Sequence, residues 1–132
     1  MKKLLTSALV LGLITGLVNA ALGYFLGDGI LETPFEPGTQ NHLPNTTFAG
    51  MAMFSSVLLT FLGALILGFL HKRSGEKGIR TWRIIAIVFL VAYGIFPFMA
   101  PEMATTNAAI LVNIMHLVSG IPALLQLPTR VE

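Results

Sequence analysis

The sequence contains no cysteine and few charged side chains. Without cysteine the chain has no disulfide, no thiolate metal ligand and no cysteine nucleophile. Only 11% of its 132 residues are charged, whereas a soluble domain carries about a quarter. The formal net charge of +2 is too small to indicate nucleic-acid binding. These shortages argue against a soluble domain or a nucleic-acid-binding protein and indicate a lipid bilayer as the solvent.

Apolar residues are abundant instead, at 55% of the chain, and they occur in long runs. A membrane-spanning helix needs roughly 20 mostly apolar residues. Four segments reach this length, and none has Asp, Glu, Lys or Arg within its apolar part. We therefore predict a single all-α domain over residues 1–132, a four-helix transmembrane bundle. Its helices are expected at about 4–26, 48–70, 82–100 and 105–127.

The basic residues all fall on one side of the predicted membrane. They precede the first span, lie in or next to the 71–81 connection, or follow the last span, whereas the 27–47 connection and Glu102 lie on the acidic side. Positive charge is retained in short cytoplasmic loops. We therefore predict cytoplasmic N- and C-termini, a cytoplasmic 71–81 loop and an external 27–47 loop. This topology is that of a multi-pass protein of a plasma membrane.

A second interpretation of the N-terminus is a cleaved secretory signal. Residues 1–20 have a basic start, an apolar middle and Val18-x-Ala20 as a cleavage site. Against this interpretation, the apolar run continues through Ala21–Leu26 and reaches full spanning length. Cleavage would leave three spans and move the new N-terminus to the other side of the membrane.

Small residues recur every four positions in the first two spans. The hydrophobic effect does not drive helices together in lipid, so close approach of small side chains and buried polar contacts must do so. A four-residue step keeps residues on one helix face. We predict that these rows pack helices tightly, either within the bundle or between copies. The rows include Gly12 and Gly16 in the first span and Ala52, Ser56, Thr60, Ala64 and Gly68 in the second.

A few polar side chains lie near the middle of the predicted spans. Unpaired polar groups in hydrocarbon cost several kcal/mol, so the amides of Asn19 and Asn113 are expected to turn inward. Their expected partners are each other, the imidazole of His116 or the hydroxyl of Tyr93. Counting at about 1.5 Å per residue places these groups at a similar depth. We predict one inward polar layer, which is also the candidate ligand site: Asn19, Ser56, Tyr93, Asn113 and His116.

The polar layer has two interpretations. It can hold helices together, at about 1 kcal/mol per hydrogen bond. It can also bind a ligand or move a proton, because ionisable residues inside a membrane often mark functional sites and histidine titrates near neutral pH. A transport route normally has more than one ionisable group, and no Asp, Glu, Lys or Arg accompanies His116.

No motif for catalysis or metal binding is present. His42, His71 and His116 are predicted outside, inside and within the membrane, so they cannot share a metal ion. The sequence also lacks a P-loop, a Gly-x-Ser-x-Gly elbow and a His-Glu-x-x-His motif. We expect no enzymatic activity, no cofactor and no bound metal.

Two hypotheses for function follow. The leading one is a non-enzymatic packing or interaction bundle in the lipid bilayer that associates with itself, as a homo-oligomer, or with another membrane protein through its small-residue rows. The alternative is a small transporter or lipophilic-ligand-binding protein that uses His116 as its proton or ligand contact.

Several segments carry a recognisable combination of motifs: LVNAALGYFL with Asn19, the loop PFEPG, RTWRIIAIVFLVAY at the third span and NIMHLVSGIPALLQLPTR in the fourth. Together they resemble a family of small bacterial four-helix membrane proteins, of which Met115-His116-Leu117 is the most distinctive element. That family has no known function. The resemblance implies four spans and directs attention to Asn19 and His116, but it implies no activity. The long external loop and the extra bend at Pro97 depart from the family pattern.

Overall fold

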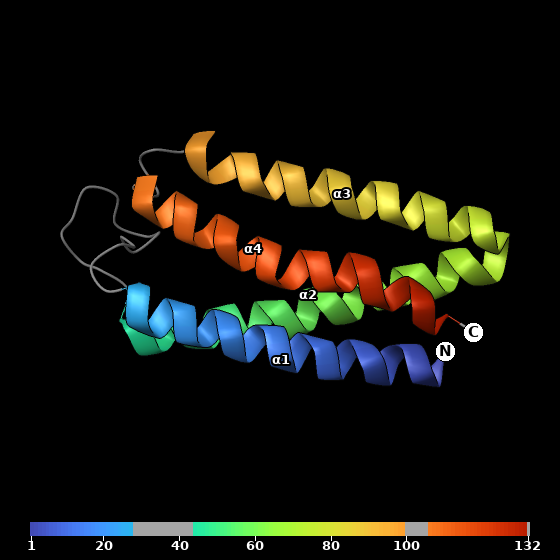
Figure 1. Cartoon of the computed structure of the whole chain (residues 1–132), viewed down its shortest axis with the longest axis horizontal. Coiled ribbons are helices and arrows are strands. Elements are labelled where there is room, and N and C mark those ends of the chain that lie inside the picture. The colour runs from blue at the N-terminus through green and yellow to red at the C-terminus, as the bar shows by residue number, and fades with distance from the viewer. Residues whose placement is uncertain (28–43, 100–105, 132) are drawn as a thin grey trace.

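The computed structural model describes residues 1–27, 44–99 and 106–131, which form four long helices and one short 3-10 helix (Figure 1). No strand occurs in these ranges. All four helices are long and apolar enough to cross a membrane. The predicted all-α, four-helix bundle is therefore confirmed. The elements are α1 (Lys2–Leu26), α2 (Asn45–Ser74), α3 (Glu76–Met99), α4 (Thr106–Gln126) and η1 (Leu127–Arg130).

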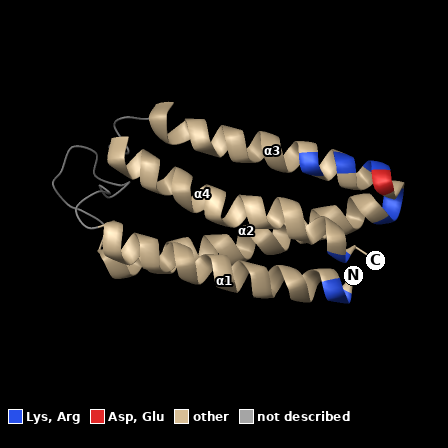
Figure 2. Cartoon of the chain, viewed as in Figure 1, with Lys and Arg blue, Asp and Glu red and all other residues tan. Residues whose placement is uncertain are grey.

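The four helices lie side by side, with α2 and α4 between α1 and α3 (Figure 1). Both termini and the α2–α3 connection lie at the same end of the bundle. Every Lys and Arg also lies towards this end, which we call the basic end (Figure 2). The acidic residues predicted for the opposite side fall outside the described residues. The basic end carries Lys2, Lys3, Lys72, Arg73, Lys77, Arg80, Arg83 and Arg130.

The connection predicted at 71–81 is almost entirely helical. The chain reverses direction at Gly75, which has a φ of 55°. Glycine adopts such a positive φ without steric cost, because it has no Cβ. A Cβ on Gly78 would overlap the Leu70 carbonyl group, so α3 packs against α2 directly after the turn. Hydropathy located the apolar part of each helix but not its end, because Lys, Arg and Glu are good helix formers outside the membrane.

An apolar cluster near the basic end joins all four helices and η1. Its three largest fully buried side chains are Leu4 of α1, Leu67 of α2 and Leu127 of η1. Trp82 of α3 packs into the same cluster, and its Nε1 donates a 2.8 Å hydrogen bond to the Gly63 carbonyl of α2. This end of α3 is therefore fixed by both packing and hydrogen bonding.

The small-residue rows of α1 and α2 face each other within one chain. A Cβ on Gly12 would lie 2.9 Å from the Val57 Cα, and one on Gly16 would lie 3.1 Å from the Met53 carbonyl oxygen. The two backbones thus approach so closely that little more than hydrogen fits between them. The buried members of the rows are Ala8, Gly12, Thr15, Gly16, Asn19 and Gly23 in α1, and Ala52, Ser56, Thr60, Ala64 and Gly68 in α2.

Substitution of Gly12 by Ala tests this close approach. A helical Gly→Ala change normally gains up to about 1 kcal/mol from propensity, but here the added methyl would press on the Val57 backbone. We expect Gly12→Ala to lower the free energy of unfolding by about 1–3 kcal/mol, measured by denaturation in mild detergent.

Gly50→Ala is the matched control, because a Cβ there has nothing within 4 Å. It is expected to leave stability unchanged or to raise it. Equal effects of the two substitutions would show that α1 and α2 do not meet closely at Gly12.

Candidate functional site

The polar residues predicted to form one layer lie in two separate clusters on two faces of α4. Successive helix residues are rotated by about 100°, so Met115 and His116 point in different directions. The first group, the central cluster, contains Asn19, Ser56, Ser119 and the Met115 carbonyl group. The second group, the α3–α4 seam, contains Tyr93, Gly94, Asn113 and His116.

Asn19 is the centre of the first cluster and is only 3% exposed. Its Nδ2 lies 2.9 Å from the Ser56 hydroxyl oxygen of α2, and 3.1 Å and 2.8 Å from the Met115 carbonyl oxygen and the Ser119 hydroxyl oxygen of α4. The Ser119 hydroxyl donates to Ser56 at 3.3 Å, and Ser56 donates to the Ala52 carbonyl oxygen at 2.7 Å. One amide group of α1 therefore links α1 to both α2 and α4.

The amide hydrogens of Asn19 have hydrogen-bond acceptors, but its amide oxygen has no donor among the described residues. Its two amide hydrogens face three oxygens. Its Oδ1 is buried and accepts no hydrogen bond from any residue that the structure describes. A buried acceptor without a donor costs about 1–3 kcal/mol, so this cluster is not a completely satisfied network.

Sequence reasoning placed Ser56 in the layer but did not include Ser119. The sequence left the rotation of α4 about its axis undetermined, because apolar residues surround that helix. The available signal was the row Ala108, Leu111, Met115 and Ser119, whose spacing of three and four residues defines one face. Serine is also short enough to let α4 approach α1 closely. Asn19 therefore pairs with two serines rather than with Asn113, His116 or Tyr93.

Asn113 connects α4 to α3 instead. Its Nδ2 donates to the Gly94 carbonyl oxygen at 3.0 Å and to the Ala109 carbonyl oxygen of its own helix at 2.8 Å. Pro97 has no N–H to donate to the Tyr93 carbonyl group, which weakens the helical hydrogen bonding here. Asn113 thus supplies a hydrogen bond to the neighbouring carbonyl group, at the point where the proline disturbs α3.

His116 and Tyr93 form the rest of the seam. Their rings meet edge to face, with centroids 5.7 Å apart and an interplanar angle of 79°. The His116 Nδ1 is buried without a hydrogen-bond partner among the described residues. Tyr93 is 49% exposed, stacks on Phe89, and its hydroxyl likewise has no hydrogen bond within the described part of the chain. The seam therefore offers hydrogen-bonding groups that no described residue uses.

An open apolar groove runs beside the seam. It has a volume of about 530 Å³, and Asn113 is its one amide-bearing residue. His116 does not line it, although it lies on the same face of α4 as Asn113. The groove is lined by Leu90, Val91, Gly94, Ile95, Phe98, Asn113 and Leu117.

The histidines are separated along the bundle. His71 lies in the last turn of α2 at the basic end, whereas His116 lies in the middle of α4. His42 falls outside the described residues. Among residues 1–27, 44–99 and 106–131, no group of three or more His, Cys, Asp or Glu is placed to hold a metal ion.

A double-mutant cycle tests the division into two clusters. For Asn19→Ala and Ser119→Ala, which share a hydrogen bond, we expect a coupling energy of about 0.5–1.7 kcal/mol in the free energy of unfolding. For Asn19→Ala and Asn113→Ala, which share none, the two effects are expected to add within about 0.5 kcal/mol. Unfolding in mild detergent measures both cycles. Strong coupling between the two amides would instead support a single polar layer.

The chain belongs to the Family of unknown function (DUF6069), and the match covers residues 2–131. It therefore includes all four helices and η1. The resemblance to an uncharacterised family is confirmed. No curated protein and no solved structure matches the chain.

Proposed function

We propose that this member of an uncharacterised family is a non-enzymatic multi-pass protein of a bacterial plasma membrane that acts by lateral association in the bilayer. The partner that we propose is a second copy of the chain, and the contact surface is α3. We also propose that the basic end faces the cytoplasm, because positive charge is retained on that side.

The first support is how little of the apolar segment of α3 is buried within its own bundle. Only 6% of its most apolar segment is buried, compared with 33% for α1, 28% for α2 and 22% for α4. Its three buried residues, Gly78, Ile79 and Trp82, all lie in its first turns at the basic end. Most of α3 is therefore free to contact lipid or another protein.

The observation that carries the proposal is the hydroxyl group of Tyr93, which has no hydrogen bond within the described part of the chain. Lipid alone can cover an apolar helix face, but acyl chains offer no hydrogen-bond partner to a phenol. Tyr93 lies far from both ends of the apolar part of α3 and is 49% exposed. A two-fold symmetric dimer places the same patch of both copies together, which would give this hydroxyl a polar partner.

The small-residue rows do not serve this association. Gly12 and Gly16 are buried against Val57 and Met53 of the same chain. The surface between copies must therefore differ from the one that the sequence pattern indicated. The side of α3 that carries Tyr93 also carries the exposed side chains of Phe89 and Phe96.

Cysteine scanning tests the proposal cleanly, because the chain has no cysteine of its own. Single cysteines on the side of α3 that carries Tyr93 are expected to give disulfide-linked dimers in liposomes under mild oxidation. Equally exposed cysteines on α1 are expected to give none above the rate of random collision. At about 100° per residue, the α3 positions on this side are Ile85, Phe89 and Phe96, and the α1 controls are Val10, Ile14 and Leu17.

The closest matched pair is Phe89→Cys and Ile14→Cys. The two side chains are 59% and 56% exposed, and they lie thirteen and twelve residues after the first residue of their helices at the basic end. Similar cross-linking from both helices, or none from any α3 position, would refute association through α3.

A second candidate function is supported by His116. Its Nδ1 has no partner among the described residues, and an apolar groove lies on the same side of α4. A lipophilic ligand with one polar group could lie in the groove and hydrogen-bond to the imidazole or to Asn113. The protein would then be a small transporter or a lipophilic-ligand-binding protein.

His116→Gln distinguishes this function from the first. Glutamine keeps hydrogen-bonding capacity but does not titrate. If His116 contacts a ligand, a small molecule retained through purification in mild detergent should dissociate differently between about pH 5 and pH 8, and this pH dependence should vanish in the variant. Mass analysis reports both the retained molecule and the copy number. A retained ligand with the same pH profile in both proteins would exclude His116 as the contact.

A further inference from the structure

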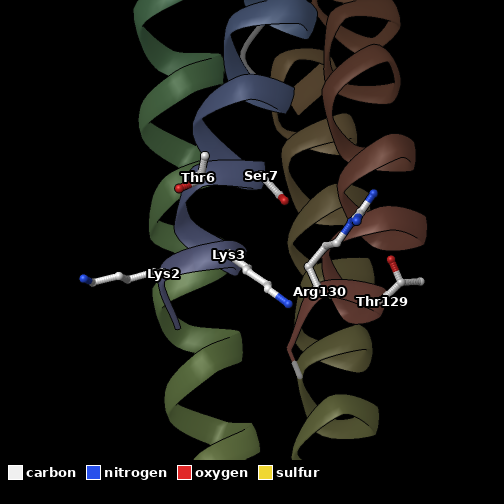
Figure 3. A pocket seen from close by; sticks show the side chains of 6 residues that line it. All are labelled: Lys2, Lys3, Thr6, Ser7, Thr129 and Arg130. Atoms are coloured by element: carbon white, nitrogen blue, oxygen red, sulfur yellow. The ribbon is translucent and has the colours of Figure 1, made fainter.

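A hollow of about 440 Å³ lies at the basic end, between the start of α1 and η1 (Figure 3). Every lining side chain is cationic or carries a hydroxyl group, and none of them is acidic. This composition is the opposite of the apolar groove beside α3. The lining residues are Lys2, Lys3, Thr6, Ser7, Thr129 and Arg130.

The cationic side chains approach from two different elements. Lys3 and Ser7 lie one turn apart on α1 and extend towards Arg130 of η1 (Figure 3). Within the described part of the chain, neither Lys3 nor Arg130 has an ion pair. Two like charges directed at one hollow repel each other unless an anion lies between them.

The backbone around the hollow is firmly held. Leu4, next to Lys3, and Leu127 at the start of η1 are each 1% exposed and pack in the same apolar cluster. Pro128, which lacks an N–H, follows directly where α4 gives way to the 3-10 helix. The positions of Lys3 and Arg130 are therefore set by core packing and do not depend on an attraction between the two side chains.

We propose that this hollow binds the phosphate group of an anionic membrane lipid. Arg130 can donate two parallel hydrogen bonds to phosphate oxygens, Lys3 supplies a second positive charge, and the Ser7 hydroxyl is available as a donor. Thr129 is not such a donor, because its hydroxyl already donates to the Gln126 carbonyl oxygen at 2.8 Å.

The depth of the hollow assigns the phosphate to a lipid. The apolar part of α1 begins at Leu4, immediately after Lys3, so the hollow lies where the spanning segment leaves the hydrocarbon. Lipid headgroups occupy this level, and juxtamembrane Lys and Arg attract anionic ones. The inference is independent of association through α3.

Native mass spectrometry with phosphatidylglycerol as the probe tests the site. Each lost hydrogen bond to the charged phosphate is expected to weaken lipid binding about ten-fold, so Lys3→Gln combined with Arg130→Gln should weaken it about a hundred-fold. The matched control is Lys77→Gln with Arg80→Gln, which removes the same charge from exposed residues at the same end. This pair should leave binding unchanged, and all variants should keep the helical content of the natural chain.

Three results would overturn the proposal. Equal losses in the two double variants would indicate a general attraction of the basic end for anionic lipid. Unchanged binding in the Lys3/Arg130 variant would show that lipid binds elsewhere. Thermal stabilisation by inorganic phosphate that matches phosphatidylglycerol, and that also requires Lys3 and Arg130, would assign the hollow to a soluble phosphate compound.

Discussion

The contact between the Asn19 amide and the two serines determines how the helices are arranged. In hydrocarbon there is no water, so the amide must satisfy its hydrogens within the protein. It reaches Ser56 of α2 and Ser119 of α4 at the same time. These hydrogen bonds turn the Asn19 face of α1 towards both α2 and α4. On the same helix, Gly12 and Gly16 lack side chains and therefore let the backbones of α1 and α2 approach closely. The result is a close pair of α1 and α2 against which α4 packs, while α3 packs against α2 and α4.

α3 is joined to α2 near the basic end and to α4 further along, where Leu90 also packs against Gly120. Near the basic end, Trp82 packs in the apolar cluster and hydrogen-bonds to α2. Near the opposite end, the Gly94 carbonyl group accepts from Asn113 of α4. Between these points the seam contains the ring contact of Tyr93 and His116, where hydrogen-bonding groups are left over. Any partner or ligand that engages them would therefore act between two fixed ends of the helix.

The sequence predicted the number and type of helices because the bilayer imposes a minimum apolar length, which can be counted directly. It also singled out Asn19, because an amide in an apolar run needs partners. It did not reveal which partners, since that depends on the rotation of each helix, and α4 is apolar on several faces. Asn113 and His116 consequently face α3 rather than Asn19. Helix ends such as Ser74 and Glu76 were missed because polar helix formers extend beyond the apolar runs.

The distribution of polar groups separates structural from functional roles along the bundle. Hydrogen bonds in the central cluster connect three helices and bury Asn19 almost completely, so a change there affects the fold first. The seam and the basic hollow differ, because His116, Tyr93 and Arg130 present groups that no described residue uses. An unused polar group in the hydrocarbon is costly to leave without a partner, whereas Arg130 is exposed at the basic end, where water can solvate it. The unused Oδ1 of Asn19 is enclosed by the central cluster, but Tyr93 and Arg130 are exposed. The exposed side chains, rather than the buried amide, are therefore the ones that lipid or a partner can reach.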